Sequence, residues 1–328
     1  MLKILIDLTK KILRGKNVTH SDALHLSSFT DQKDIVSLIS FANIIRSEFK
    51  GSNIDTCAIV NAKSGKCPED CKFCSQSAHH KTNIEKYPLI SREKIISKAK
   101  AAKEMGAVRF GIITSGRGVK NDDDLNNICS AIKGITQETK IHECASLGVL
   151  TKEAALMLKE AGLKRYHHNL ETARSFFPEI CTTHSYDERL ATIKIAKEAG
   201  FEVCCGGIFG IGETPEQRLE FAFTLRELEI DSIPMNFLNP IPGTPLENEP
   251  QIPPMEILKL IAIYRFILPK ADIRICGGRQ KNLRNTQGIA YLAGANAVMI
   301  GDYLTVPGGD PGEDIQLIKD LMLNPKLT

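Results

Sequence analysis

The feature that most constrains this chain is a regular alternation, from about residue 54 onward, of short β-type runs with longer helical segments. The runs rich in branched and small apolar residues predict eight strands, at Ile54–Ala62, Ala107–Thr114, Ile141–Leu147, Arg165–Glu171, Phe201–Gly210, Ser232–Asn239, Ala271–Gly278 and Ala297–Asp302. The helical patterns between them include Ser91–Met105, Thr151–Ala161, Ser185–Ala199, Pro215–Glu229 and Pro254–Ile267. Strands that alternate with helices predict a parallel sheet of the α/β class.

At this chain length, eight parallel strands are most economically closed into a (β/α)8 barrel of the TIM type. An open doubly wound sheet is the alternative, but no glycine-rich fingerprint follows the first predicted strand and no change of composition marks a second domain. We therefore predict a barrel domain over residues 51–328 that is preceded by a helical extension over residues 1–50. From Val306 onward we expect a loop followed by a short helix.

The overall charge does not indicate a partner. The 42 Lys+Arg residues against 39 Asp+Glu leave a formal net charge of +3, too small to predict binding to nucleic acid or to an anionic membrane surface. The most apolar long stretch, Ile257–Leu268, is too short to cross a bilayer. The N-terminal segment Met1–Gly15 resembles an amphipathic helix rather than a signal peptide, so we expect a cytoplasmic protein. In that reducing compartment, the ten cysteines are better candidates for metal ligands than for disulfides.

Three cysteines follow the first predicted strand at C-x3-C-x2-C spacing, namely Cys67, Cys71 and Cys74. In a barrel such a loop opens on the C-terminal face, where active sites are built. Thiolates suit iron–sulfur clusters or zinc, and three thiolates leave one iron of a four-iron cluster free for another ligand. A closed zinc site would need a fourth ligand, for which His79 or His80 is available.

The fourth predicted strand carries an unusual row of polar side chains. With a period of two, His167, Asn169 and Glu171 share one face. A carboxylate is rarely buried without a partner, and this combination suits hydrogen bonding to hydroxyl or urea-type groups. We expect this face to line a ligand site, the alternative being an edge strand with a solvated face.

The segment from Asn61 to Ser77 resembles the signature of the radical S-adenosylmethionine superfamily, and its flanks resemble the biotin synthase family. The likeness continues over about residues 40–325 through Ser115–Gly118, Tyr166–Glu171, Gly206–Glu213, Asp231–Asn236, Gly243–Leu246 and Gly277–Arg279. It implies that Cys67, Cys71 and Cys74 hold a 4Fe-4S cluster, whose open iron is chelated by S-adenosylmethionine. An electron passed through that cluster would release a 5'-deoxyadenosyl radical.

The resemblance also implies the reaction. A radical sulfurtransferase of this family inserts sulfur between C6 and C9 of dethiobiotin to form biotin, consumes two molecules of S-adenosylmethionine and draws the sulfur from an auxiliary iron–sulfur cluster. A flavodoxin or ferredoxin would deliver the electrons, and a homodimer is expected.

By the same likeness, Asn169 and Glu171 match positions that hold the adenosyl ribose, and Arg189 matches the arginine that pairs with the methionine carboxylate. His167 and Asn236 match substrate-binding positions. His167 and Glu171 depart from the asparagine and aspartate that are usual in the family, which puts the substrate contact at His167 in question.

A second cluster in this family lies inside the barrel, where three strand cysteines and an arginine hold a 2Fe-2S centre. Cys144, Cys204 and Arg279 match three of those positions, but the remaining position, after Phe110, is Gly111. The 2Fe-2S centre of the family therefore lacks one of its usual cysteine ligands in this chain.

Two cysteines are available to compensate. Cys205 could face the lumen only through a bulge, because adjacent strand residues point to opposite faces, whereas Cys276 could point inward directly. We therefore predict an auxiliary cluster of 2Fe-2S or larger type held by Cys144, Cys204 and Cys276. In the alternative interpretation Cys144 and Cys276 are buried packing residues, the role we also expect for the other isolated cysteines, Cys57, Cys129 and Cys181.

Two other functions remain open at this point. A related radical enzyme without sulfur insertion, of the hydrogenase maturase or methylornithine synthase kind, is favoured by Gly111. A zinc-binding structural protein would use the same loop cysteines without redox chemistry, and would be colourless where an iron–sulfur protein is brown.

Overall fold

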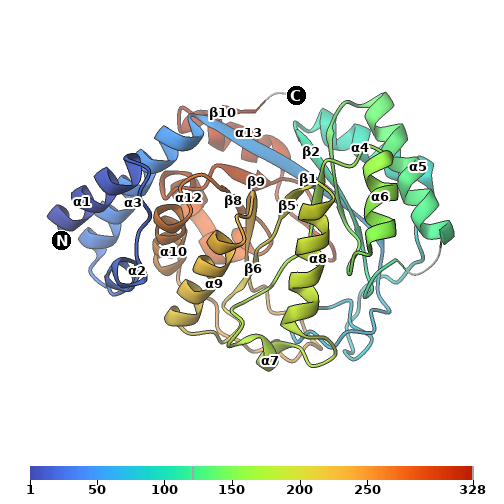
Figure 1. Ribbon diagram of the computed structural model, residues 1–328, viewed down its shortest axis with the longest axis horizontal. Coiled ribbons are helices and arrows are strands. Elements are labelled where there is room, and N and C mark those ends of the chain that lie inside the picture. Colours follow the sequence, from blue (N-terminus) through green and yellow to red (C-terminus); the bar gives the residue numbers. More distant parts are fainter. Residues whose placement is uncertain (120–121, 327–328) are drawn as a thin grey trace.

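The computed structural model describes residues 1–119 and 122–326 of the chain, and its strands form a closed parallel barrel (Figure 1). The strands are β1 Asn53–Lys63, β2 Arg109–Thr114, β3 His142–Ser146, β4 Arg165–His167, β5 Glu202–Cys204, β6 Gly207–Phe209, β7 Ser232–Phe237, β8 Asp272–Ile275, β9 Ala297–Met299 and β10 Asn324–Pro325. They pair in the order β1-β2-β3-β4-β5-β7-β8-β9, and β9 pairs back to β1. The predicted (β/α)8 barrel is therefore confirmed.

One predicted strand, Phe201–Gly210, is in fact two short strands. β5 and β6 both pair with β7, and the chain bends between them at Cys205 and Gly206. A Cβ atom at Gly206 would lie 2.0 Å from the carbonyl oxygen of Pro234, so no other residue fits this crossing without moving the backbone. Glycine at this position allows the bend that brings β6 against the loop after β4.

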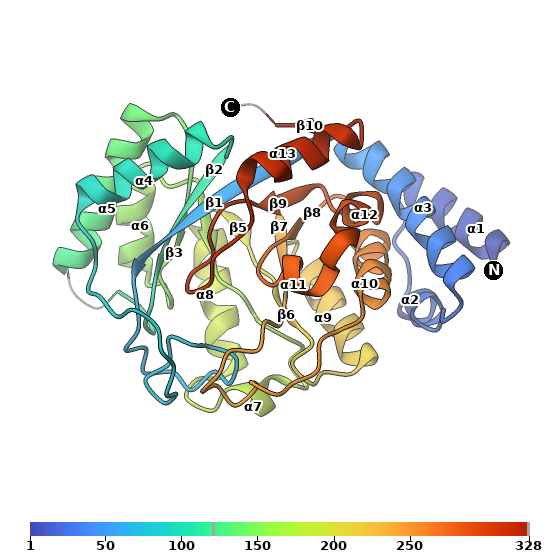
Figure 2. The same cartoon turned by 180° about the vertical axis from the view of Figure 1, so that it is seen from behind.

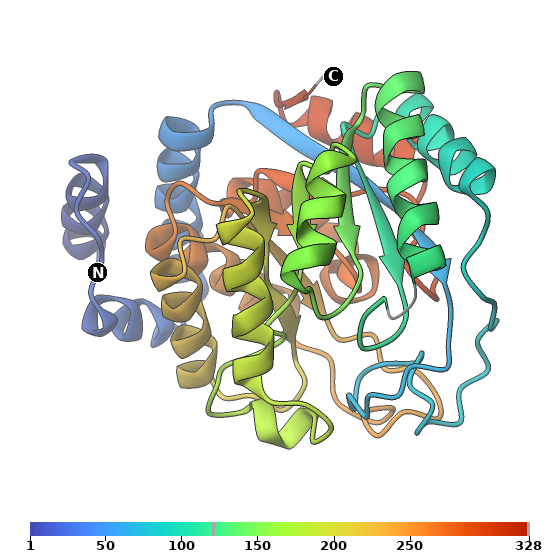
Figure 3. The same ribbon diagram turned by 45° about the vertical axis from the view of Figure 1, so that its right-hand side comes forward.

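Helices cover the outside of the barrel on all sides that Figures 1 and 3 show. They are α4 Arg92–Glu104, α5 Asp122–Glu138, α6 Lys152–Glu160, α8 Tyr186–Glu198, α9 Pro215–Glu227, α10 Pro254–Ile267, α12 Gln287–Leu292 and α13 Pro311–Asp320, with short pieces at α7 Phe177–Ile180, α11 Arg279–Leu283 and the 3-10 turn Arg284–Thr286. The side chains of Ser91, Thr151, Ser185 and Thr214 cap α4, α6, α8 and α9 by accepting hydrogen bonds from backbone N–H groups. The expected short helix after Val306 is α13.

Three N-terminal helices, α1 Leu2–Leu13, α2 His20–Ser27 and α3 Gln32–Lys50, lie together on one side of the barrel (Figure 2). They pack against α9, α10 and α12. This explains why α10 is apolar on all faces: it lies between the barrel and α3, and every residue from Ile257 to Ile267 is buried. The predicted boundary at residue 50 falls in the turn between α3 and β1.

The N-terminal end of the lumen is closed by charged side chains from the first residues of several strands. Arg274 Nη2 lies 2.6 Å from Asp55 Oδ1, and Arg109 Nε lies 3.0 Å from Asp55 Oδ2. Beside them, Arg165 Nε donates to Glu202 at 3.0 Å. Burial alone would raise the pKa of Asp55, but the guanidinium groups of Arg274 and Arg109 hold it well below its ordinary value. These ion pairs join β1, β2 and β8 at the closing seam of the barrel.

In the described part of the chain, no helix combines the length and the apolar character that crossing a membrane requires.

We expect Asp55→Asn to destabilise the protein, because the buried guanidinium of Arg274 loses its carboxylate partner, while Arg109 keeps only the pair with Glu202. Removing one partner of a buried ion pair costs about 3–5 kcal/mol, so the midpoint of urea denaturation at neutral pH should fall. Folding lowers the pKa of Asp55, so its stabilisation is present above its unfolded pKa of about 3.9 and is lost as the pH falls toward the folded value. The difference between the two proteins should therefore shrink below about pH 4.

The matched control is Asp187→Asn, which removes an exposed carboxylate whose partner, Arg174, is also exposed. Its midpoint should stay at the wild-type value. Equal midpoints for Asp55→Asn and Asp187→Asn would contradict the role given to the buried pair.

Candidate active site

Two adjoining cavities occupy the lumen and the C-terminal end of the barrel. The larger, of about 550 Å³, is lined by side chains from every strand from β1 to β9. The smaller, of about 190 Å³, lies beside the loop that follows β1. His167, Asn169 and Glu171 line both cavities. The polar face predicted on the fourth strand thus separates two compartments of one site.

The loop after β1 folds back on itself and brings three thiols to the smaller cavity. Cys67, Cys71 and Cys74 all line that cavity, and none of them forms a disulfide. The Cys74 N–H donates to the Cys71 carbonyl at 2.9 Å, and the Ala78 N–H donates to the Cys67 carbonyl at 2.7 Å. A compact loop with three free thiols facing one cavity fits a cluster that has three protein ligands and one open iron.

The two histidines considered as a fourth ligand point elsewhere. His79 Nε2 lies 3.0 Å from the Pro68 carbonyl oxygen, and His80 Nε2 lies 3.0 Å from that of Cys71. Neither ring lines the smaller cavity. The structure therefore gives the closed zinc site no support from these two residues.

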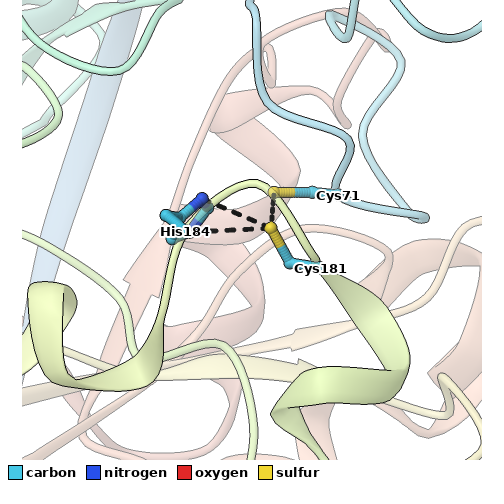
Figure 4. Close-up of side chains that lie close together, drawn as sticks. All are labelled: Cys71, Cys181 and His184. Atoms are coloured by element: carbon cyan, nitrogen blue, oxygen red, sulfur yellow. Dashed lines mark hydrogen bonds between the residues drawn. The ribbon is translucent and has the colours of Figure 1, made fainter.

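Cys181, expected to be a packing residue, lies against the cysteine loop (Figure 4). Its Sγ atom is 3.7 Å from Cys71 Sγ and 3.3 Å from His184 Nδ1, which brings three metal-binding side chains together. Both nitrogens of His184 are engaged, however: Nδ1 donates to Glu69 at 2.5 Å, and Nε2 accepts from Arg189 Nε at 2.9 Å. We therefore interpret the group as a support for the cysteine loop rather than a separate metal centre. No spacing in the sequence indicates this group.

Asn169, Glu171 and Arg189 form one polar corner of the smaller cavity. Arg189 Nη1 donates to the Asn169 carbonyl at 2.7 Å and lies 3.7 Å from Glu171, while Asn169 Nδ2 donates to Glu171 at 3.3 Å. Burial raises the pKa of Glu171, although Arg189 and His167 oppose that shift. Arg189 also contacts His184, so this corner is linked by hydrogen bonds to the cysteine loop. The corner offers both a cation and hydroxyl-binding groups to a ligand beside the three thiols.

The two predicted substrate-binding residues both reach the larger cavity. The amide of Asn236 is held in place from both sides, since Nδ2 donates to the Gly207 carbonyl at 3.1 Å and Oδ1 accepts from the Gly277 N–H at 3.0 Å. One amide hydrogen and one lone pair remain for a ligand. Burial alone would lower the pKa of His167, but the Cys204 thiolate and its hydrogen bond to the imidazole raise the pKa above its ordinary value.

The lumen contains four cysteines at strand positions, namely Cys57, Cys144, Cys204 and Cys276. Cys144, Cys204 and Cys276 were predicted to face it, whereas Cys57 was expected to be a packing residue and lines the cavity as well. Cys205 does not line the cavity; it is fully buried and its N–H donates to the Ser232 carbonyl at 2.9 Å. The strand alternation therefore holds, and Cys205 does not compensate for Gly111.

Arg279 does not line the larger cavity, whereas another arginine, Arg274 on β8, does. The guanidinium of Arg279 donates to Asp314 and, at 2.5 Å, to Gln287. Arg279 follows the end of β8 and opens α11, and its guanidinium reaches both Asp314 on α13 and, at 3.3 Å, the Met299 carbonyl on β9. The period-two pattern of β8, which puts Arg274 and Cys276 on one face, was the signal that could have found this arginine.

Comparisons with known proteins identify the class. Residues 62–225 match the model of the radical SAM superfamily, and residues 234–324 match the Biotin and Thiamin Synthesis associated domain. Among solved structures, methylornithine synthase superposes with a TM-score of 0.84 at 21% identity, covering 97% of each chain. The FeFe-hydrogenase maturase of Carboxydothermus hydrogenoformans superposes with a TM-score of 0.82 at 19% identity, covering 98% of this chain and 79% of that one. These two similarities show the fold, and the chain is a member of the radical SAM superfamily.

Curated relatives narrow the assignment further. A biotin synthase of Geotalea uraniireducens (strain Rf4) is 51% identical over 97% of this chain and 96% of its own length. A biotin synthase of Carboxydothermus hydrogenoformans is 50% identical over 98% of this chain and 99% of its own length. Within the superfamily, this chain belongs to the biotin synthase family.

We expect Gly207→Ala to disturb the corner that holds Asn169 and Glu171. A Cβ atom at Gly207 would lie 2.0 Å from the Glu171 carbonyl oxygen, so the backbone at Glu171 must move. Binding of S-adenosylmethionine, measured by equilibrium dialysis, should weaken. The control Gly51→Ala adds a methyl group where no atom lies within 4 Å, although at a positive φ, and should keep wild-type binding. Wild-type binding by Gly207→Ala would refute the close approach.

Proposed function

We propose that this protein is a radical S-adenosylmethionine sulfurtransferase that inserts sulfur between C6 and C9 of dethiobiotin to form biotin. The observation that carries the proposal is the juxtaposition of two thiol-lined compartments. A three-cysteine loop faces the smaller cavity, four more cysteines line the larger one, and His167, Asn169 and Glu171 lie between them. A reaction that needs both a radical source and a sulfur source requires this arrangement. The cofactors of the family are a 4Fe-4S cluster, S-adenosylmethionine and an auxiliary iron–sulfur cluster.

The residues that would hold the first cluster are Cys67, Cys71 and Cys74. When bound there, the cluster and S-adenosylmethionine supply a 5'-deoxyadenosyl radical, once for each of the two hydrogens removed from dethiobiotin. The chain's own contribution is to fix the three thiols through the folded loop and to support Cys71 through Cys181 and His184. The hydrogen bond from Arg189 to His184 ties the loop to the cofactor-binding corner.

In that corner, we assign Asn169 and Glu171 to the ribose hydroxyls and Arg189 to the methionine carboxylate. A guanidinium suits a carboxylate, and the amide and carboxylate side chains suit vicinal hydroxyls. Two residues, Glu171 and Arg189, are each nearly nine-tenths enclosed by their surroundings, which keeps water from competing for these hydrogen bonds.

The substrate would lie in the larger cavity, with His167 and Asn236 toward its ureido ring. A ureido group has one carbonyl acceptor and two N–H donors, and the amide of Asn236 retains one donor and one acceptor for it. The apolar side chains of Ile59, Ile113 and Ile208 line the same cavity and suit the hydrocarbon carbons at which the sulfur enters.

We assign the auxiliary cluster to Cys144, Cys204 and Cys276, with Arg274 in place of Arg279 as the lumen arginine. All four line the larger cavity. The positive charges of Arg165 and Arg274 offset the negative charge that buried thiolates introduce.

The electron donor, the oligomeric state and the cellular compartment are proposed from the family resemblance. We propose a flavodoxin or ferredoxin as electron donor, a homodimer as the assembled form and the cytoplasm as the compartment. The ten unpaired cysteines of the chain suit a reducing compartment.

The central test is anaerobic incubation with dethiobiotin, S-adenosylmethionine and a reductant, followed by mass spectrometry. We expect both biotin and 5'-deoxyadenosine. Cys71→Ala should form neither product, because the cluster loses one of its three ligands. The control Cys129→Ala, in α5 and outside both cavities, should form both. Deoxyadenosine without biotin from the wild-type protein would retain the radical chemistry and refute dethiobiotin as the substrate.

A second prediction concerns Arg189→Gln, which removes the guanidinium from the corner. A hydrogen bond to a charged group contributes about 1.5–3 kcal/mol, so the KM for S-adenosylmethionine should rise by about 10- to 100-fold. The iron content after reconstitution should not change, since Arg189 is not a proposed ligand. The control Arg174→Gln changes an exposed arginine and should leave the KM unaltered. An unaltered KM for Arg189→Gln would remove the carboxylate assignment.

A further inference from the structure

Apart from Cys74 of the loop after β1, the larger cavity is lined by one more cysteine than the three assigned to the auxiliary cluster. Three of the chain's ten cysteines lie in the loop after β1, and Cys129, Cys181 and Cys205 lie outside the larger cavity. The remaining four, Cys57, Cys144, Cys204 and Cys276, all line it. We propose that Cys57 is a fourth thiolate ligand of the auxiliary cluster, in addition to Cys144, Cys204 and Cys276. This inference rests on the auxiliary cluster of the proposed function.

The strand register places Cys57 beside Cys276. The short strand β9 lies between β8 and β1. Its residue Ala297 is paired with Arg274 on β8 and with Asp55 on β1. The side chains of Arg274 and Asp55 meet inside the barrel at 2.6 Å. Two residues further along their strands, Cys276 and Cys57 face the same lumen at the next level, since the side-chain period is two. Cys57 and Cys276 therefore lie at one level of the lumen, on the two strands that flank β9.

The other two thiols belong to the same group. Cys144 on β3 is paired with Arg165 on β4, and Cys204 on β5 is paired with His167 on the same strand β4. Both cysteines line the larger cavity together with Cys57 and Cys276. Four thiols surround one cavity that has buried guanidinium groups on its floor. They form a donor set of four cysteine thiolates, which is the set that iron–sulfur clusters prefer.

Gly111 on β2 lies close to the side chains of the neighbouring strand β1. Gly111 pairs with Ile59 on β1 and with Cys144 on β3. A Cβ atom at Gly111 would lie 3.1 Å from Cγ2 of Ile59, so a larger residue at this position would require a small shift of the isoleucine side chain. Cys57 lies two residues before Ile59 and on the same face of β1. The loss of a ligand on β2 is thus accompanied by a thiol on the neighbouring strand, one level lower in the barrel.

The inference is tested in the full chain that carries Cys67→Ala, Cys71→Ala and Cys74→Ala, in which only the lumen site can bind a cluster. After anaerobic reconstitution with ferrous iron and sulfide, iron and sulfide per chain are measured and Mössbauer spectra are recorded. Adding Cys57→Ser should lower the iron content that remains after gel filtration by about tenfold, or change the isomer shift of one iron site in the Mössbauer spectrum. Either result is expected because oxygen replaces sulfur at that iron. Cys57→Ala, which supplies no ligand atom, should lose iron in the same way.

The matched control adds Cys129→Ser, a buried cysteine of α5 outside the cavity, to the same triple variant. It should keep the iron content and the spectrum of its parent. If both Cys57 variants have the same iron content and spectra as the Cys129→Ser control, the assignment of Cys57 is overturned. That result would leave biotin formation by the wild-type enzyme intact, so it is distinguishable from a failure of the proposed function. A triple variant that retains no iron would overturn the lumen cluster together with its fourth ligand.

Discussion

The buried ion pairs of Asp55 with Arg274 and Arg109 are the interaction on which the rest of the barrel depends. They join β1, β2 and β8 across the short strand β9, which is where the ring closes. They also hold guanidinium groups on the floor of a cavity lined by thiols. The same contacts therefore close the fold and make the interior electrostatically suited to an anionic cluster.

A second constraint connects the two halves of the site. His184 donates to Glu69 in the cysteine loop and accepts from Arg189, which contacts Asn169 and Glu171. A movement of the loop is thus transmitted to the corner proposed for S-adenosylmethionine. Positioning of this kind matters in radical chemistry, because the protein must hold one C–H bond near the reactive carbon and exclude competing partners.

Much of the fold followed from hydrophobic periodicity and helix caps, since the barrel was predicted correctly and each predicted strand overlaps a strand of the structure. The predicted strand Arg165–Glu171 is shorter, however, and ends at His167. The break between β5 and β6 was missed because it depends on the approach of Gly206 to Pro234, a tertiary contact that a strand pattern does not contain. Cys57 and Arg274 were missed for a related reason. A period of two shows which residues share a face, but only the strand register shows that this face is the lumen.

The ion pairs at the N-terminal end of the barrel bear on where ligands bind and leave. Asp55 and Arg274 are each more than nine-tenths buried, and their ion pair lies at the end of the barrel opposite the loop that carries Cys67, Cys71 and Cys74. Under the proposed reaction, the substrate would lie in the larger cavity, between this ion pair and the smaller cavity assigned to S-adenosylmethionine. In that arrangement we expect the cofactor products to be exchanged at the C-terminal end of the barrel while the substrate stays in the larger cavity.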